Sequence, residues 1–264
     1  RYNIKNFFQQ QHKLELRNDN FFVRGYVVSD NAGDSYDMVF TGININRAWK
    51  DDNTWFGEYA GTYVQQSLGG ATNAQAHAAA RAVADTGMFM PGTPEYDAAY
   101  NRSVNDPDLS TGSKFQDESK YYHGDFNYNF SHLLDIADIQ VGGSYRQYSL
   151  NSSGTIYTDY DGAIDYSEYG VYTQVQKELE LSSELELKLT GSVRYDKSEY
   201  FDGFFSPRLS AGLTINRDHN IRASVQTGFR NPTTQDLFIG LDAGRAILVG
   251  SAPSNLDRWT RDYD

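Results

Sequence analysis

The 264-residue chain contains no cysteine, which excludes a disulfide framework and any metal site built on thiolates. It also lacks an apolar run near the ~18–20 residues that a transmembrane helix needs. Positive charge is scarce, since 23 Lys and Arg stand against 35 Asp and Glu, for a net charge of −12. Because phosphate binding requires a basic surface, this balance argues against a nucleic-acid partner.

Catalytic signatures are missing as well. The chain has no Gly-x-Ser-x-Gly, no His-Glu-x-x-His and no phosphate-binding glycine loop, and its five histidines share no ligand spacing. The sequence therefore predicts a protein that is not an enzyme and that carries no cofactor.

Aromatic residues are abundant, with 20 Tyr and 15 Phe. Aromatics favour β-strands in general, and they also form the girdles of outer-membrane barrels. The mean hydropathy of −0.63 resembles that of a soluble protein. However, strands of a membrane barrel are half polar, so hydropathy does not detect them.

The clearest pattern is an alternation with a period of two in the stretch 184–238. From Leu185 to Tyr195, every second residue is apolar or small, and the residues between are polar or charged. The same alternation returns over 208–216 and over 220–230. A period of two indicates strands with one apolar and one polar face, so three consecutive antiparallel strands are expected here.

Five further stretches alternate in the same way, which brings the expected total to eight strands. Strands near ten residues exceed the usual ~5–6 and suit the ~9–11 that cross a bilayer when tilted. A soluble barrel with its apolar face inward would alternate too, so the pattern favours the membrane barrel without deciding the matter. The five stretches are 2–16, 21–29, 120–132, 137–150 and 168–181.

The lengths of the connections alternate between short and long. Outer-membrane barrels have short periplasmic turns and long extracellular loops, so this alternation predicts which end of each strand faces outward. The short connections are 17–20, 133–136, 182–183 and 216–220, and the long ones are 30–118, 151–167, 197–206 and the stretch from 231 onward.

The longest connection, 30–118, loses the alternation and is expected to be partly helical. Residues 73–84 are rich in Ala, the best helix former, with Thr72 or Asn73 as N-cap, and a short helix is expected at 94–100. We interpret the stretch as an extracellular helical insertion; a separate soluble domain is the alternative.

Two short motifs lie on the last two strands of the pattern. Ser206-Pro207-Arg208-Leu209 opens one strand, and Gly228-Phe229-Arg230-Asn231-Pro232-Thr233 follows the next. Together, in this order, they closely resemble a segment of TonB-dependent outer-membrane receptors. The resemblance implies an all-β transmembrane antiparallel β-barrel, of which this chain supplies about eight strands of a larger, ~22-stranded barrel with a plugged lumen.

The family resemblance also implies a function and a location. Receptors of this kind reside in the bacterial outer membrane, capture a scarce solute with extracellular loops and import it using energy from the inner membrane. The implied partners are TonB, acting through the plug, outer-membrane lipid, and a small-molecule, oligosaccharide or peptide ligand. A surface lipoprotein is a further candidate partner. The alternatives are a passive porin-like channel and a surface adhesin or structural barrel.

The two ends of the sequence lead us to expect an internal piece of a longer protein. Residues from Arg1 already alternate like a strand, and Arg261–Asp264 follow a loop instead of closing an aromatic-ended strand. We expect 1–264 to be part of one β-barrel domain, with the plug domain and the C-terminus of the barrel outside this chain.

Candidate site residues fall into three groups. The first consists of solute-binding candidates in the loops 31–118, 151–167 and 231–260, although Trp55 and Tyr59 would equally serve to hold their loop together. The second is a lumen-facing wall of ion pairs, which the family resemblance points inward. The third is an acidic loop, either a calcium site or simply solvated. In this order they are Trp55, Tyr59, Arg230, Asn231 and Asp236; Arg194, Arg208, Arg222, Glu184 and Glu186; and Asp159, Asp161 and Asp165.

Overall fold

The computed structural model describes residues 2–242 and 246–258. Residues 261–264, which are expected from the sequence to follow a loop, and parts of the candidate loop 231–260 (243–245 and 259–260) lie outside the described residues. The chain divides into two compact units. The helical unit comprises Arg1–Phe8 and Ala32–Gln116, and the sheet unit comprises Gln9–Asn31 and Asp117–Asp264, each over its described residues.

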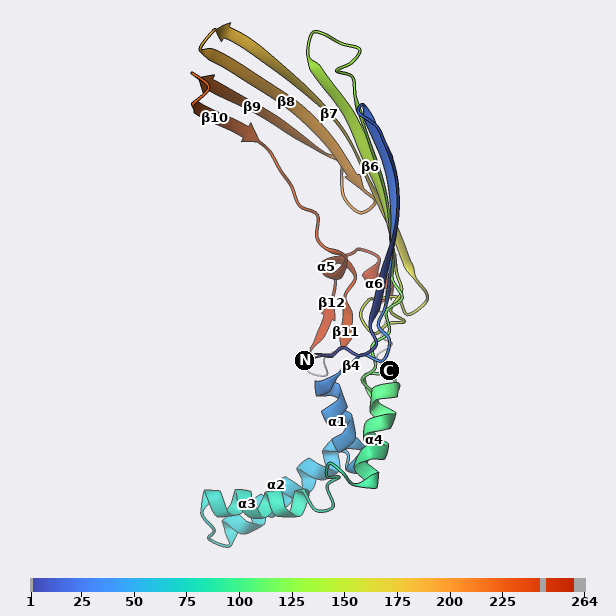
Figure 1. Cartoon of the computed structure of the whole chain (residues 1–264). Helices are drawn as coiled ribbons and strands as arrows, with labels where there is room; N and C mark the ends of the chain where they lie inside the picture. The colour runs from blue at the N-terminus through green and yellow to red at the C-terminus, as the bar shows by residue number, and fades with distance from the viewer. Residues whose placement is uncertain (1, 243–245, 259–264) are drawn as a thin grey trace. The chain divides into compact units, whose positions relative to one another are not determined.

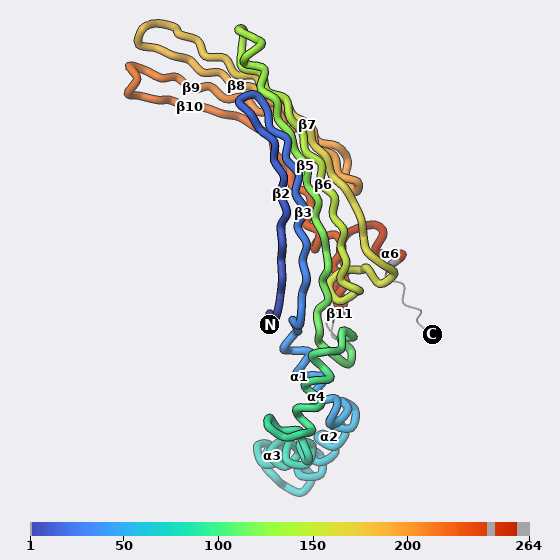
Figure 2. Tube along the Cα trace, turned by 45° about the vertical axis from the view of Figure 1, so that its right-hand side comes forward, coloured from blue at the N-terminus to red at the C-terminus, as the bar shows by residue number. Residues whose placement is uncertain are grey.

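The sheet unit is built on one eight-stranded antiparallel sheet, which confirms the expected fold class and number of strands. Its spatial order β10-β9-β8-β7-β6-β5-β3-β2 follows the sequence, so each strand pairs with the next one along the chain (Figures 1 and 2). Over the described residues the sheet stays open, with β2 and β10 at its edges, as in part of a larger barrel. The strands are β2 (Phe8–Arg17), β3 (Phe21–Asn31), β5 (Lys120–Asn129), β6 (Asp138–Leu150), β7 (Ile164–Ser182), β8 (Leu185–Ser198), β9 (Phe204–Ile215) and β10 (His219–Gln226).

The register of the strands gathers the charged residues on one side of the sheet, here called the polar face. Residues directly opposite each other in neighbouring strands share a face, and these pairs include Arg24 with Asp125, Arg146 with Glu168, and Ser192 with Arg208. The alternation read from the sequence thus extends coherently from β3 to β10.

The opposite side, here called the apolar face, carries side chains that the described residues of the sheet unit leave partly exposed. A soluble barrel would bury such a face in its core, whereas a membrane barrel turns it toward lipid. Tyr169, Tyr195 and Phe205 form part of an aromatic row on this face, with ring centroids 6.4 Å and 4.8 Å apart in that order. The apolar face includes Val23, Phe126, Val141, Tyr145, Val171, Val175, Val193, Leu209 and Val225, which are each 38–68% exposed.

The expected alternation of short and long connections is wrong in one place. Residues 199–203 alone separate β8 from β9, whereas residues 130–137 separate β5 from β6. The backbone N–H of Glu199 still donates to the carbonyl of Ser167, so the ladder continues past the predicted strand end. At the other end of the sheet, Leu133 N–H donates to the carbonyl of Phe130. This turn ends β5 earlier than expected.

Several strand boundaries also differ from the sequence expectation. The expected first strand at 2–16 is divided, since Tyr2–Asn3 form β1, which pairs with β4 (Tyr36–Asp37), and β2 begins at Phe8. β7 begins at Ile164, because Ile164 and Tyr166 are buried in a core cluster and extend the strand into the expected loop 151–167. β10 ends at Gln226, so Arg230 does not lie on a strand as the alternation predicted.

The chain after β10, here called the return segment (227–242 and 246–258), folds back onto the polar face. Its short helix α5 buries Leu237 and Phe238 against Leu150, Ile164 and other members of one hydrophobic cluster. The cluster lies where β6 ends and β7 begins. The segment contains α5 (Thr234–Phe238), β11 (Gly240–Asp242), β12 (Ile247–Val249) and α6 (Asn255–Arg258).

The helical unit confirms the helix at 73–84, with Thr72 as its N-cap in a capping box with Gln75. The helix expected at 94–100 runs on to Asn105, and α1 was not anticipated from the sequence. Asp37 begins α1 by accepting from the N–H groups of Val39 and Phe40. The elements are β1 (Tyr2–Asn3), β4 (Tyr36–Asp37), α1 (Met38–Trp49), α2 (Asp52–Leu68), α3 (Asn73–Ala84) and α4 (Pro94–Asn105).

Candidate functional site

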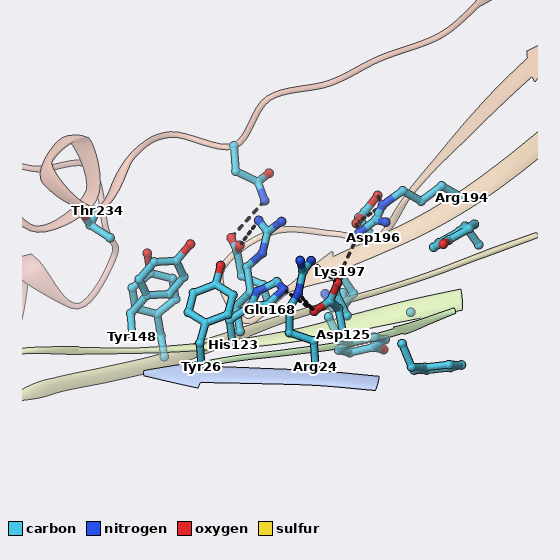
Figure 3. Close-up of a pocket in the computed structure, with 18 of the residues that line it drawn as sticks. Arg24, Tyr26, His123, Asp125, Tyr148, Glu168, Arg194, Asp196, Lys197 and Thr234 are labelled. Carbon is cyan, nitrogen blue, oxygen red and sulfur yellow. Dashed lines mark hydrogen bonds and ion pairs between the residues drawn. The ribbon is translucent and has the colours of Figure 1, made fainter. Parts of the chain in front are cut away.

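The polar face and residues 229–234 of the return segment together enclose a cavity of about 850 Å³, here called the inner cavity. Strands β3, β5, β6, β7 and β8 supply its floor, and the return segment crosses above them (Figure 3). Cavities of about 300–1,000 Å³ with a few placed polar groups are typical ligand sites. We therefore take the inner cavity as the candidate functional site.

A bidentate ion pair lies in the floor of the inner cavity. Arg24 Nε and Nη2 donate to the two carboxylate oxygens of Asp125 over 2.8 Å and 2.6 Å. His123 Nε2 lies 3.4 Å from Oδ1 of the same carboxylate. The fork geometry fixes both side chains, so their remaining polar surface is presented to the cavity in one arrangement.

A second ion pair lies within β8, and its arginine also binds β6. Arg194 Nε donates to both oxygens of Asp196 over 2.8 Å, and its Nη2 donates to Ser144 Oγ over 3.1 Å. The guanidinium also lies 5.9 Å from the ring centroid of Tyr172, whose hydroxyl accepts from Asn127 Nδ2. This network spans β5 to β8 and stiffens the floor of the cavity.

A third charged pair is looser and connects the floor to the return segment. Arg146 Nη1 lies 3.8 Å from Glu168 Oε2, while Glu168 Oε1 accepts from Asn231 Nδ2 over 3.4 Å. Arg146 Nε is buried and finds no hydrogen-bond partner within the described residues. A guanidinium with an unused donor beside a carboxylate can hold a polar ligand group.

Aromatic rings flank the charged pairs. Tyr26 stacks on His123 with centroids 4.7 Å apart, and Tyr148 stacks on Tyr166 at 4.6 Å. Figure 3 shows Tyr26 and Tyr148 projecting toward the same side of the sheet as Arg24 and Glu168. The arrangement combines flat apolar surfaces with hydrogen-bond donors and acceptors, which suits a polar organic solute better than a bare ion.

The return segment is fastened above this floor by buried polar contacts. Asn255, almost fully buried, accepts from Thr158 Oγ1 over 2.7 Å and donates to the carbonyls of Leu237 and Gly250, each over 2.7 Å. Burial raises the pKa of the nearby Tyr157 hydroxyl. The segment is thus held by its own contacts with the connection 151–163.

A second cavity of about 650 Å³, here called the outer cavity, lies on the return segment. The structure brings the sequence-predicted residues Arg230, Asn231 and Asp236 together around it, while Asn231 also lines the inner cavity. Asp236 caps α5, and hydrogen bonds from the backbone N–H and hydroxyl of Thr233 lower the pKa of its carboxyl.

Trp55 and Tyr59 lie on α2 in the helical unit, and their polar atoms are used within the α2–α3 hairpin. Trp55 Nε1 donates to Asp85 over 2.9 Å, and Tyr59 Oη lies 2.5 Å from His77 Nδ1. The rings of Trp55 and Tyr59 stack with their centroids 5.1 Å apart. These contacts favour the alternative in which the two aromatics hold the hairpin together.

The expected wall residues share the polar face, with one exception. Arg194, Arg208, Arg222 and Glu186 occupy register positions on that face, and of these Arg194 lines the inner cavity. Glu184 instead precedes β8, where its backbone carbonyl accepts from Asn216 N–H. Glu184 is therefore a turn residue.

In the acidic loop, the carboxylate of Asp159 accepts hydrogen bonds from residues of the same loop. Asp159 is almost fully buried and accepts from Ser152 Oγ over 2.6 Å and from the N–H groups of Ser152, Ser153 and Gly154. Asp161 and Asp165 are exposed. No group of three or more His, Asp or Glu in the described residues could hold a metal ion. The interpretation of Asp159 as a solvated side chain is wrong, because it organises its own loop.

Most residues of the inner cavity were not singled out from the sequence. The alternation places Arg24, Asp125, Arg146, Glu168 and Asp196 on polar faces, but only the register shows which charges face each other. A search for opposite charges on adjacent predicted strands would have found Arg24 with Asp125 and Arg146 with Glu168.

Comparisons with known proteins agree with this architecture. No helix of the described residues has the length and apolar character needed to cross a membrane. The family model "TonB dependent receptor-like, beta-barrel" matches residues 2–260. The chain is 28% identical over 99 residues to a vitamin B12 transporter, BtuB, of Vibrio vulnificus (strain CMCP6), and this match covers 38% of the chain.

The same match covers 16% of the transporter, so the chain spans only a small part of that relative. No solved structure gives a significant match. The family match nevertheless covers nearly the whole chain and agrees with the antiparallel sheet, its polar face and its exposed apolar face. The chain belongs to the TonB-dependent receptors, as part of their outer-membrane β-barrel domain.

Proposed function

We propose that the protein containing this chain is an active importer that binds a polar solute on the outer side of the barrel and passes it through the lumen. The observation that carries this proposal is the inner cavity, about 850 Å³ in volume and lined by three Arg–carboxylate pairs and several Tyr rings. Such a lining offers oriented donors and acceptors, which a passive water-filled pore does not need.

The orientation follows from the connections. In outer-membrane barrels the longer loops are extracellular, so the end of the sheet that bears the connections 32–119 and 151–163 would face outward. The return segment and both cavities lie toward that end. A solute arriving from outside would meet the outer cavity first.

Energy coupling is proposed from family membership. TonB would act through a plug domain encoded elsewhere in the protein and draw on the proton gradient of the inner membrane. The helical unit would then be an extracellular insertion, and a surface lipoprotein is a candidate partner for it, to be tested by cross-linking in intact cells.

Cobalamin is the first solute to test, because a relative bears the name of vitamin B12 transporter. Oligosaccharides, iron chelates and peptides form the rest of a panel. The full-length protein would be produced in a strain that lacks its own importers for these solutes. Uptake would be compared with and without TonB, and with and without a protonophore.

We expect saturable uptake of at least one solute, and we expect this uptake to stop when TonB is removed. The variant Glu168→Gln keeps side-chain volume but removes a charge from the inner cavity, and we expect it to weaken solute binding by roughly five- to twentyfold. Uptake that continues without TonB would instead indicate a passive channel. Cell adhesion without uptake of any solute would indicate an adhesin.

A further inference from the structure

Residues 229–236 form a wall that is one chain thick between the two cavities. Phe229, Thr233 and Thr234 line the inner cavity, whereas Arg230, Gln235 and Asp236 line the outer one. Asn231 and Pro232 line both. The two cavities are thus separated by a single stretch of backbone and its side chains.

We propose that Asn231 is a positioning residue that keeps this wall closed by donating to Glu168, and that a solute opens the wall by replacing Asn231 at that carboxylate. The inference deepens the proposed function and rests on it. It makes the outer and inner cavities successive binding sites for a solute that carries hydrogen-bond donors such as hydroxyl, amide or ammonium groups.

Both ends of the wall are anchored by apolar packing. The Phe229 ring lies 4.7 Å from the Phe204 ring of β9, and Leu237 and Phe238 are buried in the core cluster. Between these anchors Asn231 Nδ2 reaches Glu168 Oε1 over 3.4 Å. The contact is long for a hydrogen bond, so it contributes modestly and can be exchanged for a ligand contact.

The backbone of the wall is stiff at the same point. Pro232 fixes its own φ angle and disfavours the helical region for Asn231. Thr233 N–H is satisfied by Asp236 over 2.9 Å in the capping box of α5. The part of the wall before α5, residues 229–233, can therefore move as one stiff piece, without exposing the backbone N–H groups of the cap.

The charges on the two sides of the wall are of the same kind. Arg230 and Asp236 line the outer cavity, and Arg146 and Glu168 lie directly behind Asn231 in the inner one. Arg146 Nε has no hydrogen-bond partner in the described part of the chain. A solute that leaves the outer cavity, which has Arg230 and Asp236 in its lining, would meet a cation and a carboxylate again inside, so its polar groups would find partners on both sides of the wall.

Thiol labelling tests the wall without knowledge of the solute. An introduced cysteine can be labelled selectively within this chain, because the chain has no cysteine of its own. Ser144→Cys places a thiol in the inner cavity and Ser251→Cys places one at the outer cavity. A charged, membrane-impermeant maleimide would be added to cells carrying the full-length protein, and each labelling rate would be measured against the parent protein as background.

We expect the Ser251→Cys thiol to react faster than the Ser144→Cys thiol. Asn231→Ala should raise the rate at the inner thiol by about three- to tenfold, as expected from losing one weak hydrogen bond to a charged group. Asn231→Asp has the same shape and adds repulsion from Glu168, so its effect should be larger. Because Asn231 also lines the outer cavity, the rate at the outer thiol should change by less than the rate at the inner thiol.

Asn220→Ala is the control, since Asn220 lines neither cavity and the variant also removes amide contacts on the polar face. The Asn220 amide donates to Thr214 Oγ1 over 3.1 Å and accepts from Arg222 Nε over 2.6 Å. The variant should leave both rates unchanged. Equal labelling rates at the two thiols without any change at Asn231, or an inner rate that does not respond to Asn231→Asp, would contradict the proposal that Asn231 keeps the wall closed. Because labelling requires no import, this result is independent of the uptake assay that tests the proposed function.

Discussion

The two faces of the eight-stranded sheet come from one alternation of residues, yet they differ in what surrounds them. The polar face carries three Arg–carboxylate pairs and is crossed by the return segment. The apolar face leaves Val171, Val175 and Leu209 each more than two-fifths exposed. A soluble sheet would cover its apolar face first, so the comparison shows a sheet whose outside solvent is lipid.

The largest effect on stability is expected when a charge is placed on the apolar face. Val175 lies between Ile139 and Gly191 in the middle of the sheet, so Val175→Arg should lower the free energy of unfolding in lipid by about 2–4 kcal/mol. The measurement is urea unfolding of the full-length barrel in lipid vesicles. Gln174→Arg is the control, because it adds the same charge one residue away on the polar face and should cost far less.

The second prediction concerns the buried contacts that hold the return segment on the polar face. Asn255→Ala removes three hydrogen bonds from a buried site, one accepted and two donated, which leaves Thr158 Oγ1 and the Gly250 carbonyl without these partners. The Leu237 carbonyl keeps its hydrogen bond from the N–H of Ala252 over 2.9 Å. Stability of the return segment should fall by about 2–3 kcal/mol. Hydrogen exchange of residues 237–242 and 246–252 would report this directly. Unchanged protection there would mean that the segment is held by the apolar cluster alone.

A smaller effect is expected from the ion pairs of the polar face. Arg24 is about a third exposed, so solvent screens its pair with Asp125. In a double-mutant cycle with Arg24→Gln and Asp125→Asn, we expect a coupling energy of about 1 kcal/mol, measured by the same unfolding assay. A coupling near zero would show that the pair serves geometry in the cavity and not stability.

The smallest effect concerns the pH dependence of α5. Hydrogen bonds from Thr233 hold the pKa of Asp236 below its usual value near 4. The cap therefore stabilises α5 fully above that value and is lost as the pH falls through the lower folded pKa. Exchange protection of residues 234–238 should be flat above about pH 4 and decline below it. Asp236→Asn should remove this dependence, and a decline at neutral pH would contradict it.

Much of the sheet could be predicted because the alternation is a local property. All eight strands and the helix at 73–84 follow from the period of the residues and from the propensity of Ala. Helix α1 was missed because its residues Met38–Trp49 include Val, Thr, Ile and Asn, which favour helices weakly. It forms because Asp37 caps it and because it packs on α4.

The candidate site was only partly predictable. Arg230 and Asn231 came from one motif and Asp236 from the loop that follows it, and all three lie together at the outer cavity. The inner cavity needs the register of five strands, which brings together residues as distant as Arg24 and Asp196. No local pattern encodes that register, and the contact between Asn231 and Glu168 depends on the fold of the whole return segment.

The measurement that tests the assignment of the two faces most directly uses spin labels at adjacent residues of β7. A label at Val175→Cys and one at Gln174→Cys would be compared in the full-length protein in lipid vesicles, using oxygen and a water-soluble nickel chelate as relaxing agents. We predict that oxygen relaxes the label at 175 more strongly and that the nickel chelate relaxes the label at 174 more strongly. Equal accessibility to the nickel chelate at both positions, or the reverse order, would contradict a lipid-facing apolar side and with it the barrel on which the proposed import depends.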